Sequence, residues 1–140
     1  MRKKQVVCAW INDANGKILL TQRKAGTHLE HLWEFPGGKL EPGETAAQAL
    51  ARELKEEIAI DAEIGRELAR VEHEYAGKDG APWTVELILM EVVRYVGAPR
   101  AVDVADMQWV ADAWFDAHMD DMPPADVPLV DKARQAQKVR

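Results

Sequence analysis

The sequence lacks long apolar runs and has almost no cysteine. No uninterrupted apolar run approaches the roughly 20 residues needed to span a bilayer, so no membrane association is expected. The apolar stretch after the basic start breaks at Asn12-Asp13 without a small-residue cleavage site, which predicts no signal peptide. The single cysteine, Cys8, excludes an intramolecular disulfide and is compatible with a reducing compartment. A soluble, cytoplasmic protein is therefore expected.

The sequence also lacks an excess of positive charge, low-complexity segments and internal repeats. It has 18 Lys and Arg against 24 Asp and Glu, a net charge of −6. A surface that binds duplex nucleic acid needs clustered Lys and Arg to replace counterions, so such a partner is not expected. An anionic substrate would need a bound cation. With 140 residues, 47% of them hydrophobic, the chain predicts one globular domain over residues 1–140.

The first third of the chain carries β-prone runs separated by turn signals. Two apolar runs, Gln5–Ile11 and Lys17–Arg23, flank the turn signal Asn15-Gly16 and predict a β-hairpin. After a polar loop, Leu32–Phe35 is typical of a short strand, which Pro36-Gly37-Gly38 is expected to end.

The second half of the chain predicts further strands and a terminal helix. Residues 64–75 and 83–95 alternate well enough for two long strands, although residues 67–74 could also be helical. Residues 107–110 predict another short strand, and residues 128–139 have apolar side chains at helical spacing. These elements predict a mixed α/β sandwich.

The central segment predicts one amphipathic helix. Thr45, with Gln48 three residues later, forms a capping-box pattern that marks the helix start, and the helix should run to about Ile58. At 100° per residue, one face of this helix is apolar and must pack on the sheet: Ala47, Leu50, Leu54 and Ile58.

Three acids gather beside that apolar face. Glu53, Glu56 and Glu57 are three and four residues apart, so their carboxylates share one side of the helix. Like charges at this spacing oppose helix stability, and acids in the last turns also oppose the helix dipole. A hard divalent cation resolves this conflict, because magnesium prefers carboxylate, carbonyl and water oxygens. A solvated acidic face with Arg52 and Lys55 as partners is the alternative.

The residues around this helix favour the cation site. Gly38, Glu44, the run Arg52–Glu57 and Ile60 reproduce the pattern G-x5-E-x7-R-E-U-x-E-E-x-G-U, where U is aliphatic. The chain thus resembles the Nudix family, whose signature this is. Ala59 stands where the family has glycine at the helix exit. If the left-handed backbone of that glycine is kept, alanine should cost about 1 kcal/mol.

Over nearly its whole length the chain resembles the MutT-like branch of this family. The resemblance implies the α/β (α+β) Nudix fold, a mixed β-sheet sandwiched between helices, and bound Mg²⁺, for which Mn²⁺ could substitute. The implied metal ligands are the carbonyl of Gly37 and the carboxylates of Glu53, Glu56, Glu57 and Asp103, with Asp106 as second choice for the last. The implied substrate contacts are Arg23, His28, Glu34, Phe35, Pro36 and Asp126.

The resemblance also implies catalytic roles. Arg52 should orient the acids, Glu53 should activate water as base or ligand, and Glu44 should support the site. For some of these residues a structural role is the alternative: Arg23 on the surface, His28 in a loop, Glu44 near a helix N-terminus and Asp126 as a helix N-cap. Among the tryptophans, Trp33 is the candidate for stacking on a base.

The resemblance favours one activity and leaves two alternatives. The leading hypothesis is a magnesium-dependent nucleoside triphosphate pyrophosphohydrolase that converts oxidised substrates such as 8-oxo-dGTP to the monophosphate and pyrophosphate, acting as a monomer or homodimer. The run around Asp126 looks closer to a subgroup that hydrolyses CTP or 5-substituted dCTP. A catalytically silent domain that senses a nucleotide is the third hypothesis, since Ala59 departs from the pattern.

Overall fold

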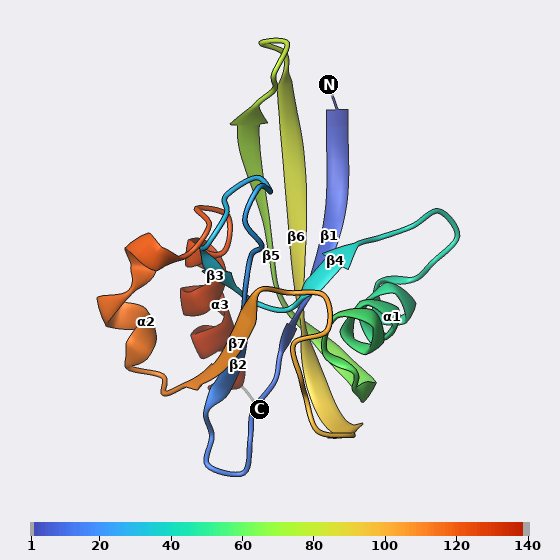
Figure 1. Ribbon diagram of the computed structural model, residues 1–140, viewed down its shortest axis with the longest axis vertical. Coiled ribbons are helices and arrows are strands. Elements are labelled where there is room, and N and C mark those ends of the chain that lie inside the picture. Colours follow the sequence, from blue (N-terminus) through green and yellow to red (C-terminus); the bar gives the residue numbers. More distant parts are fainter. Residues whose placement is uncertain (1, 139–140) are drawn as a thin grey trace.

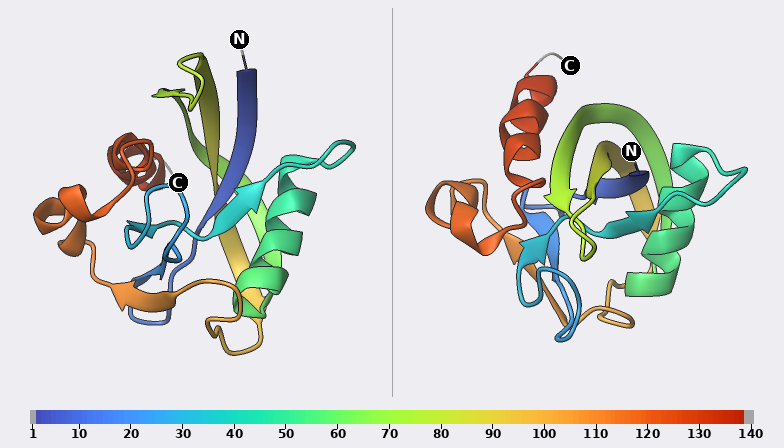
Figure 2. Two further views of the ribbon diagram at one scale, coloured as in Figure 1. Left: turned by 45° about the horizontal axis from the view of Figure 1, so that its top comes forward. Right: turned by 90° about the horizontal axis from the view of Figure 1, so that it is seen from above.

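The computed structural model describes residues 2–138, which form two β-sheets between helices (Figure 1). The larger sheet has the strand order β4-β1-β6-β5, and the smaller has the order β3-β2-β7. The strands are β1 (Arg2–Trp10), β2 (Ile18–Gln22), β3 (Trp33–Glu34), β4 (Gly37–Lys39), β5 (Asp61–Ala76), β6 (Pro82–Val96) and β7 (Asp106–Val110). The helices are α1 (Ala46–Ile58), α2 (Trp114–Ala117), the 3-10 helix η1 (Met119–Asp121) and α3 (Val127–Gln137). Helix α1 covers one side, and α2 and α3 lie on the other (Figure 2), which confirms the predicted architecture.

Strand β1 lies inside the larger sheet, where it pairs parallel with β6 and antiparallel with β4. Its two faces supply two cores: Val7 and Ala9 pack with α1, and Cys8 and Trp10 pack on the α3 side. A strand that is apolar on both faces belongs in the middle of a sheet. The predicted hairpin with β2 is confirmed only around its turn, where Asn12 bridges to Ile18 and Leu19 N donates to the Ile11 carbonyl. Beyond the turn it is wrong, because among residues 2–138 β2 pairs within the smaller sheet and not with β1.

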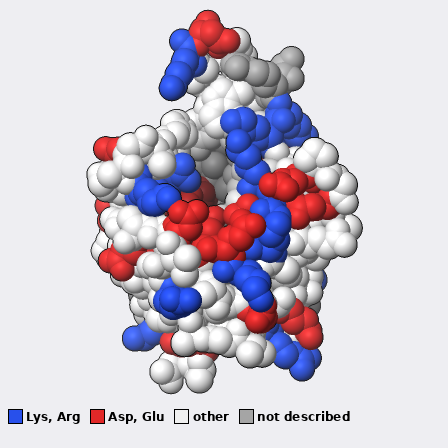
Figure 3. Space-filling view, turned by 45° about the vertical axis from the view of Figure 1, so that its right-hand side comes forward, with Lys and Arg blue, Asp and Glu red and all other residues white. Residues whose placement is uncertain are grey.

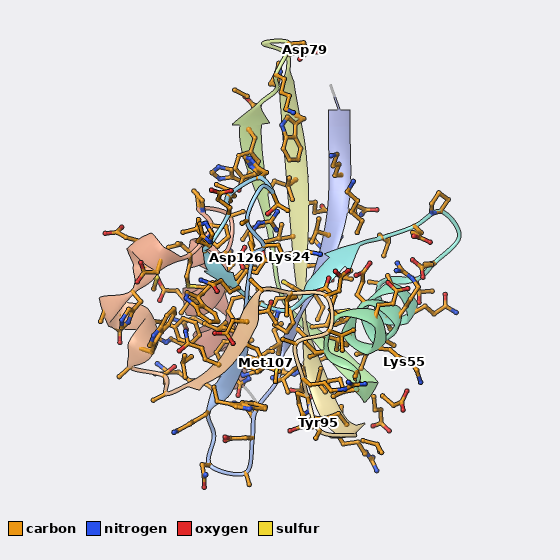
Figure 4. The ribbon with its side chains drawn as sticks, viewed as in Figure 1. Lys24, Lys55, Asp79, Tyr95, Met107 and Asp126 are labelled. Carbon is orange, nitrogen blue, oxygen red and sulfur yellow. The ribbon has the colours of Figure 1, made fainter. Side chains whose placement is uncertain are left out.

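Strands β5 and β6 form a long antiparallel hairpin that rises above the rest of the fold, with Asp79 at its tip (Figures 1 and 4). This confirms the two predicted strands. The helical alternative for residues 67–74 is wrong, because these residues pair along β6.

The segment Pro36-Gly37-Gly38 follows the end of strand β3 and contains the start of strand β4. Strand β3 stops at Glu34, and Gly37–Lys39 then pairs with β1 as the separate edge strand β4. A Cβ on Gly37 would overlap the carbonyl oxygen of Val7, so the close pairing of β4 and β1 requires glycine there.

Helix α1 begins and ends as the sequence predicts. The Thr45 side chain accepts a hydrogen bond from the backbone N–H of Gln48, and the Gln48 side chain accepts one from the backbone N–H of Thr45, which completes the capping box. The buried side chains are Ala49, Leu50, Leu54 and Ile58, so Ala49 rather than Ala47 completes the apolar face. Ala59 closes the helix with φ 61° and ψ 35°, and its N–H donates to the Lys55 carbonyl. The left-handed backbone is kept although glycine is absent.

The C-terminal part differs from prediction in three details. Helix α3 spans Val127–Gln137, and residue 139 of the predicted helix lies outside the described residues. Asp126 occupies the N-cap position of α3, but its side chain makes no capping hydrogen bond. Helices α2 and η1 were not predicted, since they are too short for a periodic signal. Among the described residues, no helix is long and apolar enough to cross a bilayer.

The backbone of Ala59 makes a stability prediction. We expect Ala59→Gly to raise the free energy of unfolding by about 0.5–1 kcal/mol, because relief of left-handed strain exceeds the entropy that glycine adds to the unfolded chain. Urea denaturation measures the change. Ala51→Gly, in the right-handed part of α1, is the matched control and should lower stability by about 0.5–1 kcal/mol. Destabilisation by both substitutions would contradict the strain at Ala59.

Candidate active site

Arg52 lies at the centre of the acids on α1. Its Nε and Nη2 contact the two carboxylate oxygens of Glu44 at 2.8 and 2.9 Å, and its Nη1 contacts Glu53 at 2.9 Å and Glu56 at 3.4 Å. Nη2 also donates to the Lys39 carbonyl at 3.1 Å. This two-pronged contact with Arg52 lowers the pKa of Glu44 to about 2. One guanidinium therefore fixes α1, the loop before it and β4 relative to one another.

Glu57 lies among further negative groups. Burial raises the pKa of Glu57 to about 9, helped by a hydrogen bond with Glu53 and by the charges of Glu53, Glu34 and Asp103. Figure 3 shows Asp and Glu side chains gathered beside a hollow in this surface, with Lys and Arg side chains flanking them. The site thus holds more negative charge than its own cations neutralise.

The two glycines of β4 bring the backbone against these acids. A Cβ on Gly38 would overlap the Glu53 carboxylate, so a side chain at this position would displace Glu53 from where it lies. Ala9 N donates to Pro36 O at 2.8 Å, and Leu40 N donates to Gln5 O at 3.0 Å. Because hydrogen-bonded pairs alternate along an antiparallel ladder, Gly37 falls at a non-bonded position, and its carbonyl faces away from β1 at the edge of the sheet.

The loop before β7 closes the site from a third side. The backbone N–H groups of Val102 and Asp103 donate to the Glu57 carbonyl at 3.0 and 3.1 Å, which pins the loop to the end of α1. The Asp103 side chain pairs with Lys24 and influences Glu57 electrostatically. The second-choice acid, Asp106, bonds instead to the N–H of Met107. Of the two loop acids, Asp103 is therefore the one placed beside the helix.

The oxygen atoms of these groups are of the kind that a divalent cation prefers, but the side chains are not already arranged around a cation. Within residues 2–138, no three His, Cys, Asp or Glu side chains stand in a coordinating arrangement. Glu53 and Glu57 share a hydrogen bond, and Glu53 and Glu56 contact Arg52. A cation bound here would displace the proton that Glu57 retains, and it would relieve the repulsion that raises the pKa of this residue.

A cavity of about 340 Å³ opens beside β4. Its walls come from segments far apart in the chain: β1, the loop after β2, β3, β4, β5, β6 and the segment before α3. The predicted substrate residues that line it are Arg23, His28, Glu34, Phe35 and Asp126, and Gly37 and Gly38 form its border with the acids. Pro36 does not line the cavity, because its carbonyl is used in pairing with Ala9.

Arg23 is engaged within the protein. Its Nη1 contacts the Glu34 carboxylate oxygens at 3.2 and 3.3 Å, and its Nε donates to the His28 carbonyl at 2.6 Å. Glu34 is largely buried, and this burial raises its pKa even though Arg23 opposes the shift. Arg23 therefore holds both the loop that carries His28 and the acid at the cavity wall.

Asp126 reaches the cavity from the segment before α3. It is 5% exposed, and its Oδ2 accepts a hydrogen bond from the N–H of Phe35 at 3.2 Å. Burial raises the pKa of Asp126 well above its ordinary value, and the Glu34 carboxylate adds to the shift. Because its pKa is raised, the Asp126 carboxyl can donate a hydrogen bond as well as accept one.

Sequence reasoning missed the opposite wall of the cavity. Tyr75 and Trp83 stack with ring centroids 5.1 Å apart, and the His28 ring meets the Tyr75 ring edge-on at 5.2 Å. Lys4 lies over the Trp83 ring at 4.7 Å. Trp33, the predicted stacking residue, packs against the core instead and does not line the cavity. No sequence motif marks Tyr75 or Trp83, since the pairing of β5 with β6 brings them together.

Comparison with known proteins identifies the family. The family model of the NUDIX domain matches residues 1–133. The chain belongs to the Nudix family. Nudix hydrolases act on phosphoric anhydride bonds and use divalent metal ions.

Three relatives resemble the chain over nearly its full length. It is 33% identical to the 8-oxo-dGTP diphosphatase of Escherichia coli strain K12, over 96% of this chain and 99% of that protein. It is 37% identical to the CTP pyrophosphohydrolase of the same strain, over 94% of this chain and 91% of that protein. The solution structure of the E. coli ORF135 protein superposes with a TM-score of 0.80 at 35% identity, covering 100% of this chain and 94% of that one. These likenesses confirm the predicted resemblance to the MutT-like branch.

The raised pKa of Glu57 predicts how the stability of the cation-free Nudix domain varies with pH. A carboxyl whose pKa rises from 4.5 to about 9 on folding binds its proton more tightly in the folded state. Its stabilising contribution is complete below a pH of about 4.5 and is lost as the pH rises toward 9. We expect Glu57→Gln, which mimics the neutral acid, to melt about 3 °C or more above the parent at a pH of about 8 in chelator.

Glu57→Gln should also remove the increase in melting temperature that added magnesium gives the parent. Added Mg²⁺ should raise the melting temperature of the parent, more strongly at higher pH, and should hardly change that of Glu57→Gln. Glu63→Gln, at an exposed acid on β5, is the control and should behave like the parent. A melting temperature of the cation-free parent that does not depend on pH over this range would contradict the raised pKa.

Proposed function

We propose that this Nudix hydrolase is a magnesium-dependent nucleoside triphosphate pyrophosphohydrolase that converts oxidised nucleotides such as 8-oxo-dGTP to the monophosphate and pyrophosphate in the cytoplasm. One observation carries the proposal: the cavity and the acid cluster of α1 meet at Gly37 and Gly38. A base held in the cavity leaves its phosphates beside the acids. The names of the relatives, 8-oxo-dGTP diphosphatase and CTP pyrophosphohydrolase, support this class of reaction.

Oxygen donors of the kind that magnesium prefers surround the phosphate end of the site. The proposed ligands are the Gly37 carbonyl and the carboxylates of Glu53, Glu56, Glu57 and Asp103. They would hold Mg²⁺, or Mn²⁺ in its place, which when bound would supply charge neutralisation for the polyphosphate and a lower pKa for the attacking water. Arg52 holds Glu53 in place, Glu44 holds Arg52, and Glu53 serves as the base or as the ligand that activates water.

At the other end of the cavity, Glu34 and Asp126 recognise the base. Two neighbouring acids with raised pKa values can share a proton, so together they offer a donor and several acceptors. The Arg23 guanidinium keeps Glu34 in place, and His28, Phe35 and the Tyr75–Trp83 pair supply apolar and aromatic contact. An oxidised guanine edge fits such a pair. A cytosine edge also fits, and the acid at position 126 is the specific observation that favours CTP or 5-substituted dCTP as the second candidate.

An assay of pyrophosphate release over a panel of nucleotides separates these candidates. The panel contains 8-oxo-dGTP, dGTP, CTP and 5-methyl-dCTP, each with Mg²⁺ and then with chelator. We expect the highest kcat/KM with 8-oxo-dGTP and no release in chelator. A preference for CTP would support the second candidate, and tight nucleotide binding without release would support the sensing domain instead.

The proposed role of Glu53 predicts a loss of turnover. Glu53→Gln removes charge without changing volume, so we expect kcat to fall roughly a hundredfold or more. The circular dichroism spectrum and a cooperative melting transition should show that the variant is still folded. Lys55→Gln, on the outer side of α1 (Figure 4), is the control and should retain activity. Near-normal turnover of Glu53→Gln would remove this residue from the mechanism.

The proposed role of Asp126 predicts a change of base preference. Asp126→Asn replaces an acid that can take up or lose a proton with a fixed donor and acceptor. We expect the ratio of kcat/KM values between 8-oxo-dGTP and CTP to shift roughly tenfold or more, and its pH dependence to flatten, because a mismatched buried polar group costs about 1–3 kcal/mol. If the ratio is unchanged and the melting temperature falls, Asp126 serves only to accept the hydrogen bond of the Phe35 N–H and does not recognise the base.

A further inference from the structure

The hydroxyl of Thr21 is buried without a hydrogen-bond partner. Thr21, on β2, is 0% exposed, and its Oγ1 contacts no donor or acceptor among the residues that the structure describes. A buried hydroxyl without a partner costs folding free energy, so buried side-chain polar atoms in proteins are nearly always paired. A valine of the same shape would avoid this cost. The unpaired hydroxyl therefore calls for a partner that the protein alone does not supply.

The strand register shows where this hydroxyl points. Thr21 pairs directly with Glu34 on β3 and with Met107 on β7, and directly paired residues share one face of a sheet. Leu19, two residues earlier on β2, lies on that face and packs in the same core as Leu54 of α1. Met107 is partly buried against the same core. The face that carries Thr21 and Glu34 is thus the one turned toward α1.

The acid cluster lies on that side of the sheet. Glu34, which pairs with Thr21 across the sheet, lines the same cavity as Gly38, and Gly38 lies against the Glu53 carboxylate. The loop before β7 joins the two elements: Ala105 N donates to the carbonyl of Gln22, next to Thr21, at 3.0 Å, and Asp103 N donates to the Glu57 carbonyl at 3.1 Å. These hydrogen bonds hold strand β2, this loop and the end of α1 next to one another.

We propose that Thr21 is a positioning residue whose hydroxyl holds a water molecule of the hydration shell of the cation bound at Glu53 and Glu57. The inference rests on the proposed function for the cation itself. Magnesium keeps several of its waters in proteins, and a buried water needs two to four polar partners. Thr21, Glu34 and the cation provide that number. A water held by the cation would give the Thr21 hydroxyl the partner that the described residues do not supply.

Thr21→Val separates this role from a purely structural one, because the two roles predict different results for stability and for metal binding. Calorimetric titration with Mn²⁺, without nucleotide, should give a dissociation constant roughly tenfold higher than that of the parent. The melting temperature in chelator should rise by about 3 °C, since an unpaired buried hydroxyl is removed. Thr21→Ser keeps the hydroxyl and should restore Mn²⁺ affinity to within about twofold of the parent, although loss of the methyl group lowers its melting temperature.

Thr84→Val makes the same chemical change at the other threonine among the buried polar side chains of residues 2–138, and it should leave Mn²⁺ affinity unchanged. An unchanged affinity in Thr21→Val, or a parent protein that binds no Mn²⁺, overturns the inference. If Thr21→Val does not fold, Thr21→Ala against Thr21→Ser gives the same comparison, because both lack the methyl group and Ser alone keeps the hydroxyl. Failure of the proposed function is seen separately, as intact Mn²⁺ binding without pyrophosphate release from any nucleotide.

Discussion

The contact of Arg52 with the acids around it is the interaction on which the rest of the site depends. Four carboxylates and one backbone carbonyl are in contact with or near its guanidinium, and the Glu44 contact alone uses two nitrogens. Without this cation, α1 would present its acids to one another with no internal compensation. With it, the Glu53 and Glu56 carboxylates are held beside the guanidinium, and β4 is held close to α1. Glu57, which lies outside the reach of Arg52 and retains its proton, is where a metal ion can take the place of that proton.

The two ends of the site are coupled through Glu34. Its carboxylate contacts Arg23, and its charge raises the pKa values of both Glu57 and Asp126. A change in charge at the cation site therefore shifts the pKa values of the acids at the base-binding end, and the reverse also holds. Gly37 and Gly38 stand between these ends, where any side chain would collide with β1 or with Glu53. The backbone itself is thus the boundary between base recognition and phosphate chemistry.

The fold and the acid cluster could be read from the sequence because both depend on local spacing. Helix α1, its capping box and the grouping of Glu53, Glu56 and Glu57 follow from a 3.6-residue period, and the left-handed position at Ala59 follows from the glycine of the family signature. The β1–β2 hairpin failed for the opposite reason. Its turn is local, whereas the partner of β1 is β6, about 80 residues away in the chain, and competition between partners is decided by the burial of two faces.

The sequence by itself determined the family, the helix with its acids and the residue types that a cation and a nucleotide need. Only the tertiary structure decided which groups form the cavity and which protons they keep. Tyr75 and Trp83 form a wall of the cavity through strand pairing, Trp33 packs against the core, and Thr21 is buried with an unpaired hydroxyl. The physical reason is that spacing along a helix or strand is local, while burial, mutual charge and hydrogen-bond supply depend on neighbours that distant segments bring together.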